Sequence, residues 1–264
     1  MRYAISSHDM NAIKASRDAG FDYVEAPVWD LIRPSESQSA FEDAVARYRG
    51  CGLPVESLNI FLAGELRCVG PDANHDDIVD YAAKVFGRMK QAGIGLMVFG
   101  SGWTRKIPDG WTKEKADVQF VSLLSRLGPL AAENGVTLVV EPLARAECNY
   151  VNTVDEGAAL ARASGSDAVG VLADSFHWDR NGETADTILA AKDRFRHAHV
   201  ATMPDRLFPG AQPHDFGPFF RALAAIGYDG RVTVEGRLAE GCDLPATMSA
   251  ALAALRAAEA AARA

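Results

Sequence analysis

The sequence lacks the features that direct a chain to a membrane or to nucleic acid. No apolar run approaches the roughly 20 residues that a membrane-spanning helix needs, and the N-terminal MRYAISSHDM does not resemble a secretory signal. The formal net charge is -8, with 27 Lys and Arg against 35 Asp and Glu. A phosphate backbone usually requires a clustered basic excess. These absences predict a soluble protein whose partner is a small polar molecule.

Cysteine and glycine motifs are also missing. The four cysteines, at 51, 68, 148 and 242, have neither CxxC nor zinc-finger spacing. We therefore expect reduced thiols in a cytoplasmic protein. No GxGxxG follows the first predicted strand, which argues against a dinucleotide-binding fold.

What the sequence does contain is a regular alternation of short β-rich runs with longer amphipathic segments. This alternation is typical of βα units around a parallel sheet. Eight such units in 264 residues predict an α/β fold, a closed (β/α)8 TIM barrel that forms one domain over residues 1–264. The predicted strands are 2–6, 23–27, 55–61, 95–100, 137–142, 169–174, 196–202 and 231–236. Helical segments include 77–93, 118–135, 215–230 and the Ala-rich 246–264.

Four consecutive predicted strands end in residues that can bind a metal ion: Glu141, Asp174, His199 and Glu235. In a barrel, a residue in phase with the interior at the C-terminal end of a strand points into the mouth. Each residue alone fits a loop cap or a surface ion pair, but four in a row favour one site. Crowded carboxylates repel one another unless a cation neutralises them. The oxygen-rich set suits Mn²⁺, Mg²⁺ or Co²⁺ and also permits Zn²⁺.

Other polar and aromatic residues near strand ends have two open interpretations. His8 and Asn59 either line the mouth or cap loops, and Trp103 either stacks on a sugar or packs against a loop. His197 shares the phase of His199 one layer deeper, so we interpret it as a hydrogen-bonded interior residue. Two long connections, 62–76 and 101–113, follow strands three and four, where barrel loops carry function.

Several segments resemble the sugar phosphate isomerase/epimerase family, the xylose isomerase-like TIM barrels that include D-tagatose 3-epimerase and hydroxypyruvate isomerase. The resemblance covers essentially the whole chain. It rests on VVEPLARAECNYVNT (139–153), VLADSFHW (171–178), RHAHVAT (196–202) and VTVEG (232–236). It implies that Glu141, Asp174, His199 and Glu235 bind one divalent cation. Mn²⁺ is the first choice, and Mg²⁺, Co²⁺ or Zn²⁺ are alternatives. Glu141 and Glu235 would also be the acid/base pair on opposite faces of a ketose.

The resemblance extends to residues that contact substrate hydroxyls. Glu147, six residues after Glu141, and His177, three after Asp174, match in spacing, whereas Arg206 is one residue out of register. In VLADSFHW, His177 lies beyond the strand. We expect the chain to bend after Asp174, and we do not expect the three-residue spacing to be a helical face.

The resemblance implies a divalent-metal-dependent isomerase or epimerase of a sugar or related keto-polyol. Two glutamates would transfer the proton through a metal-bound enediolate. An alternative is a lyase or hydrolase that acts on oxidised (keto) glycosides, such as a C-glycoside-cleaving enzyme, because the same residues can begin an elimination. Binding of a sugar without turnover is disfavoured, since binding needs no base on either face. The partner would be a non-phosphorylated carbohydrate, with a homo-oligomer (dimer or tetramer) or a partner subunit left open.

An AP endonuclease, which the same superfamily contains, is disfavoured. Its additional metal ions need histidines after strands three and four and an Asp-x-His after strand seven. This chain has Asn59, Ser101 and Gln212-Pro213-His214 in those neighbourhoods, and its net charge is -8.

Overall fold

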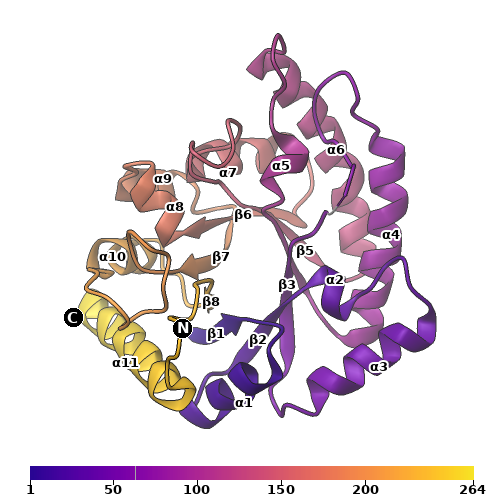
Figure 1. Ribbon diagram of the computed structural model, residues 1–264. Coiled ribbons are helices and arrows are strands. Elements are labelled where there is room, and N and C mark those ends of the chain that lie inside the picture. Colours follow the sequence, from indigo (N-terminus) through magenta and orange to yellow (C-terminus); the bar gives the residue numbers. More distant parts are fainter. Residues whose placement is uncertain (63) are drawn as a thin grey trace.

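The computed structural model describes residues 1–62 and 64–264. Within them, parallel strands pair in chain order and the last pairs with the first, which closes a barrel (Figure 1). Residue 63, in the predicted loop 62–76, lies outside the described residues. The predicted barrel is therefore confirmed. Its strands are β1 (Arg2–Ser6), β2 (Tyr23–Pro27), β3 (Val55–Asn59), β4 (Leu96–Phe99), β5 (Thr137–Val140), β6 (Val169–Asp174), β7 (Phe195–Val200) and β8 (Arg231–Val234).

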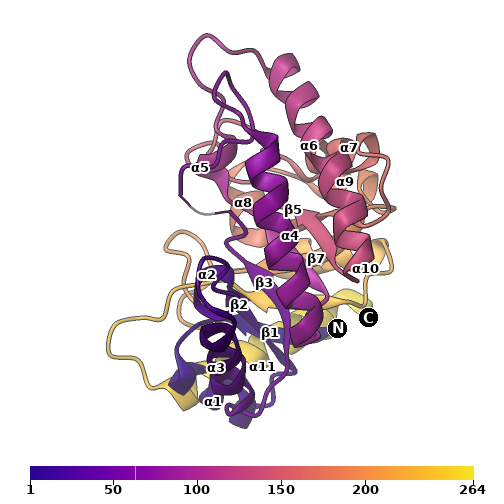
Figure 2. The ribbon, with the colours of Figure 1, turned by 90° about the vertical axis from the view of Figure 1, so that its right-hand side faces the viewer.

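Helices form the outer layer of the barrel (Figures 1 and 2). Many begin at a side-chain cap, as at Asn74 and Thr153, whose oxygens accept N–H groups of the first turn. α1 and α4 end at Gly20 and Gly93, both in the left-handed conformation that glycine adopts without strain. The helices are α1 (Met10–Ala19), α2 (Val28–Leu31), α3 (Gln38–Arg49), α4 (His75–Ala92), α5 (Gly102–Arg105), α6 (Lys113–Glu133), α7 (Val154–Ala163), α8 (Ser175–Arg180), α9 (Ala185–Ala190), α10 (Gly217–Ala225) and α11 (Leu244–Arg263).

Predicted and observed boundaries differ at several ends. β5 ends at Val140 instead of 142, because Pro142 has no N–H to continue the sheet ladder. α6 begins at Lys113, five residues before the predicted start, because the Thr112 side chain caps it by accepting the Lys115 N–H. Such corrections move boundaries without changing the order of elements.

The interior of the barrel carries an apolar cluster on β4, β5 and β6 and becomes polar toward the mouth. Leu96, Val98, Val139 and Leu172 form a small buried cluster that is separate from the larger clusters under the helices. Since side chains alternate along a strand, the residues two positions after Val139 and Leu172 face the interior as well. Those residues are Glu141 and Asp174. This cluster therefore lies beneath Glu141 and Asp174, whereas the buried residues two positions before His199 and Glu235 are the polar His197 and Thr233.

All four cysteines are free thiols, as expected. Among the described residues, no helix is both long and apolar enough to span a membrane.

Candidate active site

The four predicted ligands meet at one point. Donor atoms of Glu141, Asp174, His199 and Glu235 all lie within 4.8 Å of one another. Asp174 and His199 are direct partners in the register of β6 and β7. Glu141 and Glu235 follow the last residues of β5 and β8, and their N–H groups still donate to Phe99 and Val200 of the neighbouring strands. The sheet itself therefore sets the spacing of the four groups.

The charges at this point are strongly coupled. His199 Nδ1 lies 3.3 Å from Glu141 Oε1 and 3.3 Å from Glu235 Oε2. Burial raises the pKa of Glu141, and the charge of Glu235 raises it further. Burial also opposes ionisation of Glu235, but the charges of His199 and Arg206 outweigh it and lower the pKa of Glu235 to about 2. The two glutamates thus have environments that separate their proton affinities.

The donor set fits a divalent cation. Glu141 Oε1 and His199 Nδ1 are both buried, and neither has a hydrogen-bond partner among the described residues. A buried polar atom without a partner is costly, and a cation would satisfy both atoms. Three carboxylates and one imidazole form an oxygen-rich set of the kind that binds Mn²⁺, Mg²⁺ or Co²⁺. The cluster, in which Glu141, Asp174 and His199 are buried and Glu235 is partly exposed, could hold a metal ion.

Arg206 reaches the site although its position in the sequence is one residue out of register. Its backbone adopts a left-handed conformation, with φ of 54°, which is uncommon outside glycine. Nη2 donates to Glu235 Oε2 at 2.5 Å and to Asp174 Oδ2 at 3.1 Å. Burial would lower the pKa of Arg206, but Asp174 and Glu235 raise it above its ordinary value. The guanidinium is therefore a fixed positive charge beside the proposed ligands.

His177 also faces the site, but not for the reason that we expected. α8 begins at Ser175, directly after β6, and Asp174 caps it by accepting the Phe176 N–H at 2.9 Å. The chain does bend after Asp174. The expectation that the spacing is not helical is wrong, because Asp174 is the N-cap of α8 and His177 lies within that helix. A six-residue helix is too short to show periodicity in the sequence. His177 therefore lies in the first turn of α8, with Nε2 3.6 Å from Asp174 Oδ2.

A hydrogen bond selects the tautomer of His177 if the ring is neutral. Nδ1 accepts the backbone N–H of Ala144 at 3.2 Å, so the proton is on Nε2, which faces Asp174. Glu147 Oε1 lies 3.9 Å from His177 Nδ1 and 3.3 Å from Arg180 Nη1. Glu147 remains partly exposed and can meet a polar ligand.

An open cavity of about 460 Å³ lies over the cluster. Its lining includes Asn59, Trp103, Glu141, Glu147, His177, Arg206 and Glu235. The cavity therefore brings together most of the residues predicted from the sequence. Asp174 and His199 are not part of the lining and are buried close to it.

Asn59 and His8, which the sequence left with two interpretations each, have different positions relative to the cavity. Asn59 Nδ2 donates to Ser6 Oγ at 2.8 Å and to Glu235 Oε1 at 3.2 Å, so Asn59 helps to orient that carboxylate. His8 is exposed and packs edge-on against Trp29, 5.0 Å between ring centroids. It is absent from the lining of the cavity.

Two large apolar side chains of the cavity lining are exposed at its rim. Trp103 is 54% exposed, and Ile60 is 45% exposed with φ of 52°. A β-branched residue in the left-handed region is a strained outlier, and such strain is often found at functional sites. Arg67 stacks on the Trp103 ring, 4.2 Å from its centroid. Trp103 is therefore anchored on one side while it borders the cavity.

Three residues around Glu141 and His199 escaped the sequence analysis. Glu25, in β2, is fully buried under the site, and a charge inside the apolar run YVEAP was a signal for it. Arg105 is fully buried and donates to the carbonyls of Phe99 and Glu141, which fixes the ends of β4 and β5. A Cβ at Gly100 would overlap Glu141 Oε2, so only glycine leaves room for that carboxylate.

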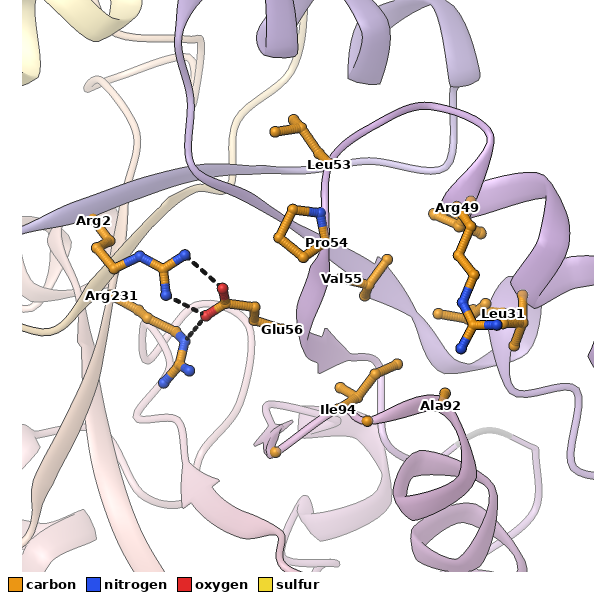
Figure 3. A pocket seen from close by; sticks show the side chains of 14 residues that line it. Arg2, Leu31, Arg49, Leu53, Pro54, Val55, Glu56, Ala92, Ile94 and Arg231 are labelled. Atoms are coloured by element: carbon orange, nitrogen blue, oxygen red, sulfur yellow. Dashed lines mark hydrogen bonds and ion pairs between the residues drawn. The ribbon is translucent and has the colours of Figure 1, made fainter.

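A larger pocket of about 600 Å³ lies at the opposite end of the barrel (Figure 3). Glu56, near the start of β3, accepts hydrogen bonds from Arg2 and Arg231, which are the first residues of β1 and β8. None of the site residues described above lines this pocket. Barrel enzymes carry their active sites at the C-terminal ends of the strands, so we assign the Glu56 end to stability.

Comparisons with known proteins agree with the barrel fold. The family model described as "Xylose isomerase-like TIM barrel" matches residues 13–258. An L-ribulose 3-epimerase from Mesorhizobium japonicum is 30% identical over 240 residues, which span 86% of this chain and 75% of the relative.

Two solved structures are similar in fold. A D-psicose 3-epimerase from Clostridium cellulolyticum has a TM-score of 0.81 at 20% identity, with 100% of both chains covered. A 3-keto-D-glucoside 4-epimerase from E. coli has a TM-score of 0.78 at 20% identity, covering 97% of this chain and 99% of the other.

Proposed function

Because this chain belongs to the xylose isomerase-like TIM barrel family, we propose that it transfers a proton within a sugar or related keto-polyol with the help of a divalent cation. Its activity class is that of the sugar isomerases and epimerases. The observation that carries the mechanism is the pairing of Glu141 and Glu235, from β5 and β8, in the wall of one cavity above a shared donor set. We propose that residues 1–264 act as one domain.

Glu141, Asp174, His199 and Glu235 are the proposed ligands, with Mn²⁺ as the first choice and Mg²⁺, Co²⁺ or Zn²⁺ as alternatives. When bound, the cation polarises a carbonyl and its neighbouring hydroxyl and stabilises the negative charge that develops as a C–H proton leaves. The orphaned donors Glu141 Oε1 and His199 Nδ1 support this assignment.

The protein's own groups then move the proton. One of the two carboxylates, Glu141 or Glu235, removes the proton from the hydroxyl-bearing carbon next to the carbonyl, and an enediolate forms. Return of a proton from the other glutamate to the same carbon inverts it. Return of a proton to the former carbonyl carbon, with the hydroxyl proton moving to the former carbonyl oxygen, isomerises the sugar. Asn59 and Arg206 contact Glu235 and hold it in place for either outcome.

Other side chains would bind the substrate. Glu147 and His177 face the cavity with polar atoms suited to sugar hydroxyls, and Trp103 presents a ring suited to an apolar sugar face. Arg206 would neutralise charge that develops on the substrate. His8, beside Trp29, remains a proposed contact only for a substrate that extends beyond the cavity.

A second candidate is an elimination reaction on a keto-glycoside, and the apolar rim is the observation that favours it. Ile60 and Trp103 are exposed where a substituent of the sugar would leave the cavity.

An additional set of metal ions, as in an AP endonuclease, has less support. Asn59 and Ser101 stand where that enzyme needs histidines, and both are already hydrogen-bonded. Asn59 donates to Ser6 and Glu235, and Ser101 Oγ accepts the Leu62 N–H. The proposed setting is the cytoplasm, with a homo-oligomer or a partner subunit.

The experiment incubates Mn²⁺-loaded protein with a panel of ketoses and keto-glycosides and analyses the products. A new epimer or isomer without bond cleavage supports the first proposal, and release of an aglycone supports elimination instead. Absence of any conversion across the panel, with metal bound, contradicts both.

A further inference from the structure

A second polar layer lies beneath the proposed metal ligands. Its central residue is Glu25 of β2, and its other members are Ser57 of β3, His197 of β7 and Thr233 of β8. All four side chains have no exposed surface. Charged groups are almost never fully buried without partners, so this layer requires an explanation beyond packing.

The carboxylate of Glu25 is held on one side by several donors. Its Oε2 accepts from Ser57 Oγ at 2.8 Å and lies 3.0 Å from His197 Nε2 and 3.5 Å from Thr233 Oγ1. Tyr23 adds a further link, because its hydroxyl is 2.9 Å from Thr233 Oγ1. Three other strands therefore contribute contacts to this oxygen, which leaves the carboxylate little freedom to rotate.

The other oxygen of Glu25 faces His199. Glu25 Oε1 lies 3.0 Å from His199 Nε2, an ion-pair contact without hydrogen-bond geometry, while Nδ1 of the same ring lies 3.3 Å from both Glu141 and Glu235. The two nitrogens of the imidazole thus face two different carboxylate layers. Any rotation of the ring that improves one contact disturbs the other.

We infer that Glu25 is a positioning residue that holds His199 with Nδ1 turned toward the metal-binding carboxylates. The inference rests on the proposed metal site. Histidine ligands commonly give their second nitrogen to a carboxylate, and loss of that carboxylate weakens metal binding by about 10- to 100-fold. Here the scaffold of Ser57, His197 and Thr233 fixes Glu25, and Glu25 in turn fixes the ligand.

A competing assignment makes Glu25, His197 and His199 a second metal site, since their donor atoms also lie within 4.8 Å of one another. The hydroxyl contacts argue against it. Glu25 Oε2 already meets Ser57 Oγ and Thr233 Oγ1 as well as His197. The number of metal ions bound per chain separates the two assignments.

The experiment measures binding of Mn²⁺ to metal-stripped protein by competition with a chromogenic chelator, together with thermal unfolding of the stripped protein. For Glu25→Gln we expect one ion per chain in both proteins and a dissociation constant about 10- to 100-fold higher than in the parent. The d–d spectrum of bound Co²⁺ should change as well, because the angle of the His199 ring is no longer fixed. Ser57→Ala is the matched control, since it removes a contact to the far oxygen only, and we expect a smaller loss.

Two outcomes would overturn the inference. One is Glu25→Gln protein with unchanged affinity and unchanged Co²⁺ spectrum, whatever its unfolding temperature. The other is two ions per parent chain, of which Glu25→Gln loses one. If Glu25→Gln does not fold, Glu25→Asp replaces it, because the shorter side chain keeps the charge but moves it away from the His199 ring. The affinity of Glu25→Asp for Mn²⁺ should then fall between those of the parent and His199→Ala. Unchanged affinity in Glu25→Asp overturns the inference equally.

His199→Ala separates this inference from the proposed function. If His199→Ala still binds Mn²⁺ as the parent does, the proposed metal site itself fails, and the role of Glu25 fails with it. If His199→Ala loses the ion and Glu25→Gln keeps it fully, only the role of Glu25 is wrong.

Discussion

Arg206 Nη2 donates to Glu235 Oε2 over 2.5 Å, from the side on which the cavity opens. The side chain that is one residue out of register in the sequence is therefore a direct partner of a proposed acid/base residue. The left-handed backbone at Arg206 makes this contact possible. It also gives the first prediction.

Replacing Arg206 with Met should move the pH dependence of turnover. Arg206 is one of the charges that lower the pKa of Glu235, so its loss should raise that pKa. Because a base must be ionised, the acidic limb of the kcat/KM profile should shift to higher pH. We also expect kcat/KM at neutral pH to fall by about 10-fold or more, since a charge-assisted hydrogen bond is lost. Arg237→Met is the control, because the Arg237 side chain is exposed and donates only to the Asp205 carbonyl among the described residues, while its backbone N–H, which donates to the Arg206 carbonyl, is kept. An unshifted acidic limb in Arg206→Met would contradict the role.

Replacing Gly100 with Ala should displace Glu141 without unfolding the barrel. The added Cβ would overlap Glu141 Oε2 and lie 3.1 Å from its Cδ. The carboxylate can give way only by leaving its place in the donor set. We expect activity to fall by about 100-fold, the order associated with loss of a general acid or base. Gly87→Ala adds the same methyl group where no atom of residues 1–62 or 64–264 lies within 4 Å, and it should keep full activity. Full activity in Gly100→Ala would show that Glu141 is not needed where it lies.

Stability should fall with rising pH because of Glu183. Burial raises the pKa of Glu183 to about 7, although the Val154 N–H donates to it. A carboxyl with a raised folded pKa stabilises the fold below the unfolded pKa, and the contribution is lost as pH rises toward 7. The loss is at most about 3.5 kcal/mol, from roughly 1.4 kcal/mol per pKa unit between the ordinary value of 4.5 and about 7. Urea unfolding of Glu183→Gln at pH 4.5 and pH 8 should show a smaller decrease than the parent. Equal decreases in the two proteins would exclude Glu183 as the cause.

Removal of the cation should lower stability as well as activity. In the stripped protein, crowded carboxylates lose the charge that the cation supplies. Restoring Mn²⁺ to 100 times its dissociation constant should add about 2.7 kcal/mol to the free energy of unfolding. Thermal unfolding of stripped protein titrated with Mn²⁺ checks this expectation, and Asp174→Asn is the matched variant with a weakened site. A parent protein whose unfolding temperature ignores Mn²⁺ would count against the metal site.

The barrel and the cluster of proposed metal ligands are predictable from the sequence for a simple physical reason. Strand side chains alternate, so Val139 with Glu141 and Leu172 with Asp174 reveal both the inward face and the mouth. Glu25 could not be assigned in this way, because its partners come from β3, β7 and β8 and meet only when the barrel closes.

Contacts that depend on local backbone conformation could not be predicted from the sequence either. The contact of Arg206 with Glu235 depends on a left-handed backbone that spacing does not encode, and α8 is too short for a periodic signal. Arg105 lies in α5, a four-residue helix inside a predicted loop. Its carbonyl partners at the ends of β4 and β5 are visible only in three dimensions.

The pairing of Glu141 and Glu235 as proton-transfer groups is the central claim, and solvent exchange tests it most directly. Parent, Glu141→Gln and Glu235→Gln proteins are saturated with Mn²⁺ and incubated in D2O with a substrate that the panel identifies, and deuterium beside the carbonyl is followed by NMR. We predict incorporation together with formation of the epimer or isomer in the parent, and a decrease of about 100-fold or more in formation of that labelled product in each variant. A variant that keeps the glutamate facing the departing proton can still take up deuterium without inversion. Formation of the labelled product at the parent rate in either variant, with the ion bound, would contradict the pairing.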